Sequence, residues 1–571
     1  MPTVSARIVT AIETAATEVF GVMGNGNAHF LDAVMAPSSP LHYTAVRHEA
    51  GAVAAADAYF RASGRIAVAT TTYGAGFTNA LTPLAEAVQA GIPLLLVVGD
   101  APTTGLRPWD VDQVRMAEAL GATTFTVTRS EPLGITTAAI EHALQNREAV
   151  VLAIPYDLAG VEADDEALPA PAHGPAHISP DPRALADAAA LLTGAERPLI
   201  LAGRGAWLSS VGEAASQLAG RIGALLTTSA LAAGLFTQED ADLGIAGGFA
   251  SDTTAGLISE ADVVLVLGAR LNQFTIRFGH AFAPSARIIQ VDITGVPTSP
   301  AVTDFVRGDA GLTVEALLAL IPERTTGSRW SDVVADRALR AHDAREDGEP
   351  TAPDGRLDPR SLCRSLDRLL PADRTVVQDG GHFIGWAPGY LRIPAPNRLI
   401  MVGTAYQSIG LGFPSAVGAA RALPDSTIVL CTGDGGGLMA LADLDSFIRT
   451  ARRGVVIVFN DAAYGAEIHQ YAVRGIDSGP MMIDEVDFAG VAAALGARSA
   501  TIAVLDDLVG VRDWLASDED GVLLLDCKIS QQVVAPYIQE IVAIAGGAMP
   551  TGGSSGAGTQ IVDAPEFAAG A

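Results

Sequence analysis

The sequence predicts an α/β protein with three domains, each built around a parallel β-sheet. Its 571 residues exceed what one hydrophobic core organises, since a domain usually holds about 100–200 residues. Short, continuous Val/Ile/Leu runs alternate with Ala-rich stretches, which is typical of parallel strands covered by helices on both faces. Two stretches interrupt this alternation and indicate linkers between the domains: one is rich in Pro, Ala and acidic residues, and the other mixes charged residues with Gly and Pro.

The expected strands follow one another along the whole chain. They lie at 66–70, 93–98, 150–154, 198–202, 263–267, 427–430 and 455–459. The expected linkers are 162–181 and 323–357, and the second of them contains one polar helix. We therefore expect domains at 1–165, 182–322 and 358–545, followed by a Gly/Ser-rich disordered tail at 546–571.

Composition excludes several classes of function. The formal net charge of −28 opposes binding to nucleic acid or to an anionic membrane. Cys363, Cys431 and Cys527 match no zinc-site spacing, and their odd number suits no disulfide framework. The N-terminal segment lacks a signal-peptide pattern, and no uncharged apolar run reaches the roughly 18–20 residues of a membrane helix. We expect a soluble, cytoplasmic protein whose partner is a small molecule.

The most specific local pattern lies at 426–464. A strand leads into the sequence GDGGG at 433–437, a helix follows, and a second strand ends at Asn460 and Asp461. Glycines at a strand-to-helix turn let phosphate oxygens approach backbone N–H groups. Asp434 and Asp461 end neighbouring parallel strands, which is where ligands bind such sheets, and two carboxylates with diphosphate oxygens suit Mg²⁺. The alternative is that GDGGG forms only a turn, since glycine-rich turns are common. A strand, a helix and a second strand that also ends in an acidic residue favour a metal and diphosphate site instead. The helix between the strands is expected to present one apolar face, formed by Leu438, Leu441, Leu444, Phe447 and Ile448.

A second candidate site lies near the start of the chain. Glu49 opens an expected helix of small residues in the sequence RHEAGAVAAADAY at 47–59. Such a helix can pack closely against its neighbours, so its first carboxyl group is expected to be enclosed and to share a proton. The alternative is an ordinary acidic residue that interacts favourably with the helix macrodipole.

These segments resemble the thiamine-diphosphate-dependent enzymes of the acetolactate synthase, benzoylformate decarboxylase and benzaldehyde lyase group. The sequence TYGAGFTN at 72–79 and the opening turn at Phe20, Gly21 and Gly24 extend the resemblance, which covers about residues 5–540. It implies a pyrimidine-binding domain, a central Rossmann-like domain and a diphosphate-binding domain, in that order. It also implies thiamine diphosphate and Mg²⁺ as cofactors.

The resemblance assigns cofactor and metal roles by position. Asp434, the carbonyl of Ala463, and Asp461, which replaces the family's Asn, would bind the metal. The residues implied to contact the cofactor are Gly433, Gly435, Gly436, Ala466, His382 at the phosphates, and Ile409 beneath the thiazolium ring. Ile409 can also be a plain core residue, and His382 can simply cap a helix.

The same resemblance assigns catalytic and substrate roles. Glu49 would hydrogen-bond the pyrimidine ring nitrogen, and Glu467 and His469 would handle protons later in the reaction. Asn25, Asn27 and Gln113 would face the substrate. For Glu467 and His469 the alternative is a polar helix surface, and for Asn25 and Asn27 it is turn formation.

The implied activity is that of an acetolactate-synthase-like transferase or lyase. Such an enzyme decarboxylates a 2-oxo acid and then protonates or carboligates the resulting enamine. Alternatives are a C–C lyase or an FAD-dependent oxidase of the same family, and a non-catalytic relative that only binds the cofactor. FAD is implied by family analogy alone, and Phe274 stands where acetolactate synthases carry an Arg, with Arg277 nearby as a substitute. The family builds each site between two subunits, so the expected assembly is a homodimer at least, and a homotetramer.

Overall fold

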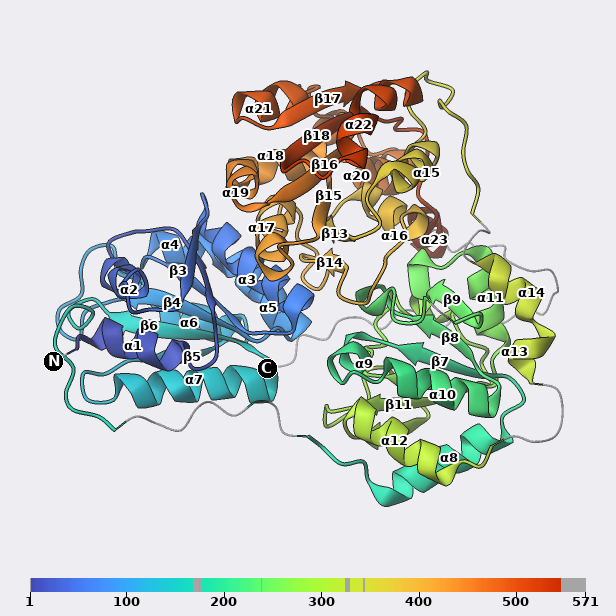
Figure 1. Cartoon of the computed structure of the whole chain (residues 1–571), viewed down its shortest axis with the longest axis horizontal. Helices are drawn as coiled ribbons and strands as arrows, with labels where there is room; N and C mark the ends of the chain where they lie inside the picture. Colours follow the sequence, from blue (N-terminus) through green and yellow to red (C-terminus); the bar gives the residue numbers. More distant parts are fainter. Residues whose placement is uncertain are drawn as a thin grey trace.

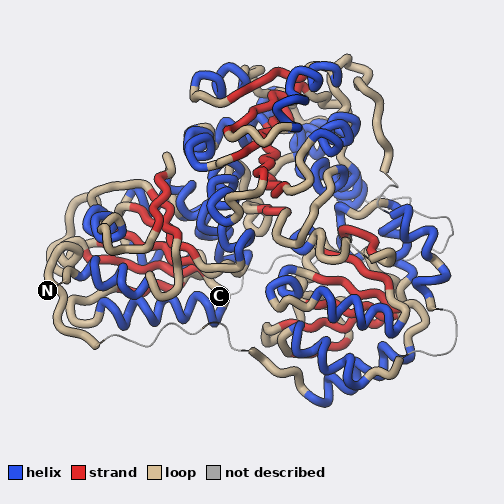
Figure 2. Tube along the Cα trace, in the orientation of Figure 1, coloured by secondary structure: helices blue, strands red, loops and turns tan. Residues whose placement is uncertain are grey.

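The protein folds into three α/β units, each with a six-stranded parallel sheet (Figure 1). The computed structural model describes residues 2–167, 174, 177–237, 239–323, 329–341 and 345–545. The predicted class, three parallel-sheet α/β domains, is confirmed. Figure 2 shows the strands of each sheet running between layers of helices. The tail at 546–571, expected to be disordered, lies outside the described residues.

The N-terminal unit has the strand order β2-β1-β3-β4-β6-β5. Its central strands are buried on both faces, which explains why they appear in the sequence as uninterrupted apolar runs. The strands are β1 (Glu18–Gly21), β2 (His42–Ala45), β3 (Ala67–Thr71), β4 (Leu94–Asp100), β5 (Thr123–Thr126) and β6 (Ala149–Pro155). The helices are α1 (Val4–Ile12), α2 (Ala28–Val34), α3 (Glu49–Ser63), α4 (Ala75–Asn79), α5 (Leu81–Ala90), α6 (Gln113–Ala119) and α7 (Pro132–Asn146).

The central unit has the strand order β12-β11-β10-β7-β8-β9. The strands are β7 (Pro198–Ala202), β8 (Leu225–Thr228), β9 (Asp242–Ile245), β10 (Val263–Leu267), β11 (Arg287–Asp292) and β12 (Asp304–Arg307). The helices are α8 (Pro182–Gly194), α9 (Arg204–Leu208), α10 (Gly212–Ile222), α11 (Asp252–Glu260), α12 (Ala310–Leu320), α13 (Trp330–Val333) and α14 (Ala335–Ala341).

The stretch 323–357 differs from the expected linker with one polar helix. Its described part contains α13 and α14, and Trp330, Val334 and Ala338 are buried in the core of the central unit. Trp330 lies on α13, Ala338 lies on α14 and Val334 lies between them, so both short helices contribute side chains to this core.

The C-terminal unit has the strand order β14-β13-β15-β16-β18-β17. The strands are β13 (Arg374–Gln378), β14 (Leu399–Met401), β15 (Thr427–Gly433), β16 (Arg453–Asn460), β17 (Arg498–Ile502) and β18 (Gly521–Lys528). The helices are α15 (Pro359–Leu369), α16 (Trp386–Tyr390), α17 (Gly412–Ala422), α18 (Asp434–Met439), α19 (Ala442–Thr450), α20 (Gly465–Tyr471), α21 (Phe488–Ala494), α22 (Arg512–Ala516) and α23 (Pro536–Ala545).

The prediction of a single helix after GDGGG is wrong. The chain forms α18 and α19 with a break at Ala440 and Leu441. Leu444 and Phe447 enter the core as expected, but the buried carboxyl group of Asp443 accepts a hydrogen bond from the backbone N–H of Arg47, at 2.7 Å, just before α3. This contact joins α19 to a segment 396 residues away in the sequence, and the local sequence pattern does not contain it.

The N- and C-terminal units pack directly against each other through α3 and α17 (Figure 1). A Cβ atom added to Gly418 would lie 2.0 Å from the carbonyl oxygen of Ala55, so the two helix backbones are in close contact. The Glu18 carboxylate on β1 and the Arg421 guanidinium on α17 form an ion pair across the same boundary at 2.9 Å. The small residues of α3 thus perform the close packing that the sequence predicts.

None of the helices in the described part of the chain combines the length and apolar character that a membrane crossing needs. The three cysteines are buried and form no disulfide. Burial raises the pKa of the Cys431 thiol to about 12, so this thiol is held in its neutral form.

Candidate active site

Two buried carboxylates lie side by side at the carboxyl edge of the C-terminal sheet. Asp434 directly follows β15 and is 3% exposed, and Asp461 directly follows β16 and is 6% exposed. The Asp434 carboxylate accepts hydrogen bonds from the backbone N–H groups of Gly435 at 2.9 Å and Ala463 at 3.2 Å. Ala462 has a positive φ of 57°, which turns the chain so that Asp461 and Ala463 both line one cavity with Asp434.

The electrostatics of this pair suit a cation. Burial, followed by the charge of Asp434, raises the pKa of Asp461 to about 8. Burial also raises the pKa of Asp434 to about 6. Two buried acids that cannot easily ionise together become favourable once a cation compensates their charge. No cluster of three or more His, Cys, Asp or Glu side chains suited to a metal occurs among the described residues. Two carboxylates and one carbonyl leave room for diphosphate oxygens and water, as Mg²⁺ prefers.

Glycines form the wall next to these acids. Gly433, Gly435 and Gly436 all line the cavity. A Cβ atom at Gly435 would lie 2.6 Å from the Tyr464 ring, and one at Gly436 would lie 2.8 Å from a carboxylate oxygen of Asp379. Side chains are therefore excluded here, and the bare backbone faces the cavity as a phosphate cradle requires.

Ile409 lies on the loop before α17 and also lines the cavity. Asp379, after β13, fixes this loop and is a residue that the sequence reasoning missed. One of its carboxylate oxygens accepts backbone N–H bonds from Gly380 at 2.8 Å, Gly410 at 2.9 Å and Leu411 at 3.3 Å. The sequence feature that could have identified Asp379 is Asp-Gly-Gly at the end of a strand, which is the same pattern that marks Asp434.

Two histidines meet at the base of the site. The His382 ring, in the 3-10 turn η4 (His382–Gly385), lies 4.6 Å from the His469 ring. His382 Nε2 accepts the backbone N–H of Ala535 at 2.8 Å, so the ring carries its proton on Nδ1. Burial, reinforced by His469, lowers the pKa of His382 to about 3. His382 therefore stays neutral, and it lines the cavity.

His469 is placed behind the cavity rather than on its wall. It is buried, its Nε2 has no partner among the described residues, and burial lowers its pKa. Its neighbours Ala466 and Glu467 do line the cavity, and Glu467 is exposed to solvent. Of the two residues predicted to handle protons on α20, Glu467 therefore lines the cavity and His469 does not.

Glu49 does not share this cavity within one chain. It is the first residue of α3, it is half-buried, and its carboxylate accepts a hydrogen bond from Asn79 Nδ2 at 3.0 Å. Within the single chain the expected enclosure is therefore not complete, since Glu49 is only half-buried among the described residues. Asp443 nevertheless fixes the approach to α3 through the backbone N–H of Arg47.

The predicted substrate residues lie at the same edge as Glu49 and also outside the cavity. Asn25 is exposed and donates from Nδ2 to the Tyr73 hydroxyl at 3.0 Å. Asn27 is buried, accepts the backbone N–H of Gly24 at 2.8 Å, and ties its turn together. Gln113 is buried and accepts the backbone N–H of Gly74 at 2.8 Å. The contacts of Asn27 are therefore those expected of a residue that forms a turn.

The chain matches three thiamine pyrophosphate (thiamine diphosphate) enzyme models in sequence. The N-terminal TPP binding domain matches residues 2–120, the central domain matches residues 185–317, and the C-terminal TPP binding domain matches residues 379–527. The chain belongs to the thiamine pyrophosphate enzyme family. The cavity accordingly lies at the C-terminal TPP binding domain of this thiamine pyrophosphate enzyme, and Glu49 lies in its N-terminal TPP binding domain.

Curated relatives with three different activities are similar to this thiamine pyrophosphate enzyme over most of their length. A sulfoacetaldehyde acetyltransferase of Castellaniella defragrans is 28% identical, over 88% of both chains. A probable acetolactate synthase large subunit of Methanocaldococcus jannaschii is 26% identical, over 93% of this chain and 92% of its own. A pyruvate oxidase of Lactiplantibacillus plantarum is also 26% identical, over 86% of this chain and 82% of its own. The chain is thus a thiamine-diphosphate-dependent enzyme of this group.

The cavity of this enzyme continues from the carboxylate pair toward the central domain, with a volume of about 1220 Å³. Phe274 lines it and packs against Phe249, with ring centroids 4.6 Å apart. The Arg277 guanidinium forms an ion pair with the Glu540 carboxylate on α23, in the C-terminal domain, at 3.0 Å. The predicted substitute for the missing Arg is therefore engaged elsewhere.

Proposed function

We propose that this enzyme uses thiamine diphosphate and Mg²⁺ to decarboxylate a 2-oxo acid. The remaining acyl fragment is then protonated or joined to a second carbonyl compound. When bound, thiamine diphosphate supplies a carbon nucleophile that stabilises the negative charge left by loss of CO₂. The observation that carries this proposal is the convergence of a buried carboxylate pair, a glycine wall and Ile409 on one cavity.

Different residues of this chain would bind the metal, hold the diphosphate and exchange protons with the substrate. Asp434, Asp461 and the carbonyl of Ala463 would bind Mg²⁺, because they offer hard oxygen ligands on one wall. The backbone at 433–436 and the neutral His382 would hold the diphosphate through N–H donors. Glu467, exposed on the same wall, would exchange protons with the substrate.

Glu49 would complete the site from a second copy of the chain. It lies outside the cavity of its own chain, at an edge where large apolar side chains are exposed. Such exposed patches mark interaction surfaces in soluble proteins. Exposed apolar residues include Met23 and Trp109 in the N-terminal domain, and Tyr471 and Ile476 in the C-terminal domain. We therefore propose a homodimer as the catalytic unit, within a homotetramer.

The decisive experiment combines binding and product analysis. The purified protein would be incubated with thiamine diphosphate, Mg²⁺ and a panel of 2-oxo acids, and the products identified by mass spectrometry. We expect Mg²⁺-dependent binding of thiamine diphosphate and CO₂ release from at least one acid, both lost in Asp434→Ala. Glu49→Gln should retain cofactor binding and lose turnover, which separates an enzyme from a relative that only binds the cofactor. Absence of thiamine diphosphate binding in the presence of Mg²⁺ would contradict the proposal.

One observation favours a second cofactor, FAD, and with it an oxidase of the same family. Arg147, Arg204 and Arg270 line the arm of the cavity that enters the central domain. Arg204 Nη1 is buried without a partner among the described residues, and burial together with nearby arginines lowers the pKa of Arg204 to about 9. A phosphate group would satisfy these donors. An absorbance spectrum of the purified protein tests this, since bound flavin is yellow.

A further inference from the structure

The loop that carries Ile409 is held in a strained conformation. It runs from the end of β14 to the start of α17. Gln407 has a φ of 60° and Gly403 a φ of 101°, and the backbone N–H of Ser408 donates to the Gly403 carbonyl at 2.9 Å. A non-glycine residue in the left-handed region is strained and persists only where its surroundings hold it there. The contacts that hold this loop therefore control where Ile409 lies.

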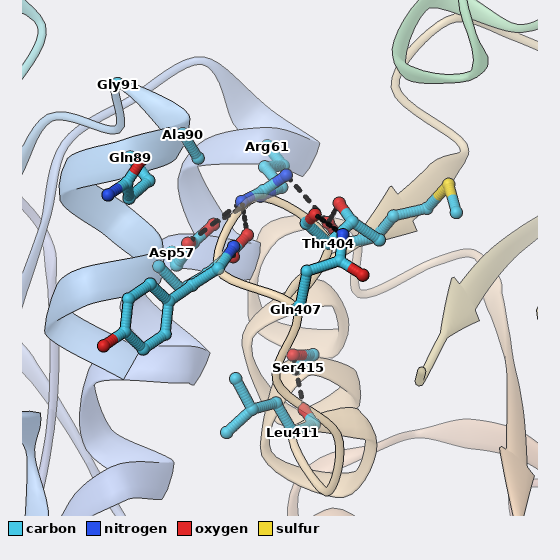
Figure 3. A network of polar contacts seen from close by, with 12 residues as sticks. Asp57, Arg61, Gln89, Ala90, Gly91, Thr404, Gln407, Leu411 and Ser415 are labelled. Carbon is cyan, nitrogen blue, oxygen red and sulfur yellow. Dashed lines mark hydrogen bonds and ion pairs between the residues drawn. The ribbon is translucent and has the colours of Figure 1, made fainter. Parts of the chain in front are cut away.

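A buried charge network from the N-terminal domain of the same chain supplies these contacts (Figure 3). Arg61, on α3, donates to the Asp57 carboxylate at 2.5 Å and to the Glu86 carboxylate at 2.9 Å. Its third contact is to the backbone carbonyl of Met401, at 2.8 Å, where the loop begins. Figure 3 shows Arg61 between Asp57 on one side and the segment with Thr404 on the other.

Glu86 is hydrogen-bonded to the middle of the loop. Its second carboxylate oxygen accepts the backbone N–H of Tyr406 at 2.7 Å, three residues before Ile409. Glu86 and Asp57 are fully buried, and Arg61 is 4% exposed. Charge-assisted hydrogen bonds of this kind are stronger than neutral ones, and burial strengthens them further. The far end of the loop is held by Asp379, so both ends of the segment around Ile409 are fixed by buried carboxylates.

We propose that Arg61 and Glu86 are positioning residues for Ile409. Through them, the N-terminal domain of a chain sets the shape of the cofactor wall in the C-terminal domain of that same chain. This inference rests on the proposed function, because it takes Ile409 as the support beneath the thiazolium ring. Arg61 itself lines the same cavity as Ile409.

The test is an isosteric substitution, Glu86→Gln. The side-chain amide has one acceptor oxygen, so it can accept from either Arg61 or the Tyr406 N–H, and the link through residue 86 between Arg61 and the loop is broken. The matched control is Glu18→Gln, which removes one charge from the buried ion pair with Arg421 at the same domain boundary, at the other end of α17. Glu86→Asp is a second variant, because it keeps the charge beside Arg61 but is one methylene too short to reach the loop.

Two measurements follow the loop and its consequence. Hydrogen–deuterium exchange of peptides covering 402–411, in cofactor-free protein, reports how firmly the loop is held. The exchange rate of the C2 proton of bound thiamine diphosphate reports whether the cofactor is correctly supported. For Glu86→Gln and Glu86→Asp we expect faster amide exchange in the loop and C2 exchange about tenfold slower than in wild type. For Glu18→Gln we expect both rates within about twofold of wild type, because Arg421 lies at the end of α17 away from the loop.

Equal effects of the Glu18 and Glu86 substitutions would overturn the proposal, because they would reflect a general loss of domain packing. Unchanged loop exchange in both Glu86 variants would also overturn it. The loop measurement needs no cofactor. Failure of the wild-type protein to bind thiamine diphosphate would therefore refute the proposed function, while the loop comparison still decides whether Glu86 holds this segment.

Discussion

Gly418→Ala tests how closely α3 must pack against α17. In the middle of a helix, replacing Gly with Ala normally stabilises a protein by about 0.5–1 kcal/mol. At Gly418 the added methyl group would lie 2.0 Å from the carbonyl oxygen of Ala55 and 2.8 Å from its carbonyl carbon. These are backbone atoms and cannot rotate away, so α3 must move. Overpacking of this kind costs about 1–3 kcal/mol, which exceeds the helical gain and reverses the sign of the effect.

The assay compares this variant with Gly256→Ala, in the middle of α11, where nothing lies within 4 Å of the added Cβ. Denaturant unfolding should show Gly418→Ala to be less stable than wild type and Gly256→Ala to be slightly more stable. Because Glu49 opens α3, C2 exchange of bound thiamine diphosphate should slow in Gly418→Ala alone. A double variant with Ala55→Gly should not recover stability, since the clash is with the backbone of residue 55. Recovery there, or stabilisation by Gly418→Ala itself, would refute the reasoning.

Three further predictions concern the site itself. Asp379→Ala should lower the thermal unfolding midpoint by several degrees and slow C2 exchange, because three backbone N–H groups lose their shared acceptor; an unchanged midpoint would contradict this. Asp461→Asn keeps an oxygen ligand but loses a charge, so calorimetric titration should show Mg²⁺ affinity about tenfold weaker. In the metal-free protein, burial is the main reason that the pKa of Asp461 is raised to about 8. Between pH 5 and 8 the folded protein therefore keeps a proton on Asp461 that the unfolded chain has released. Stability should therefore fall as pH rises from 5 to 8, and less steeply in Asp461→Asn, as denaturant unfolding at each pH would show.

The sequence predicted best the features that depend on neighbouring residues. Strands β7 and β10 have the predicted bounds, because a buried parallel strand is an uninterrupted apolar run. Asp434 and Asp461 could be placed together for a similar reason: the ends of adjacent parallel strands meet at one edge of the sheet.

What the sequence could not predict depends on contacts between distant segments. The contact of Asp443 with the segment before α3, and the roles of Asp379 and Glu86, depend on backbone N–H groups far along the chain. Such partners leave no periodic trace in the sequence. For Asn27, turn formation and substrate binding both use the same side-chain atoms, and only the observed hydrogen bonds show which groups they serve.

The central claim is that Glu49 of one chain faces the cofactor held by Asp434 of another. It is tested most directly by mixing two inactive variants, Glu49→Gln and Asp434→Ala, under conditions in which subunits exchange. A mixed dimer would contain one site with both substitutions and one site with neither, so C2 exchange of thiamine diphosphate should return to about a quarter of the wild-type level. If each chain instead carries a complete site, the mixture will stay as inactive as its two components.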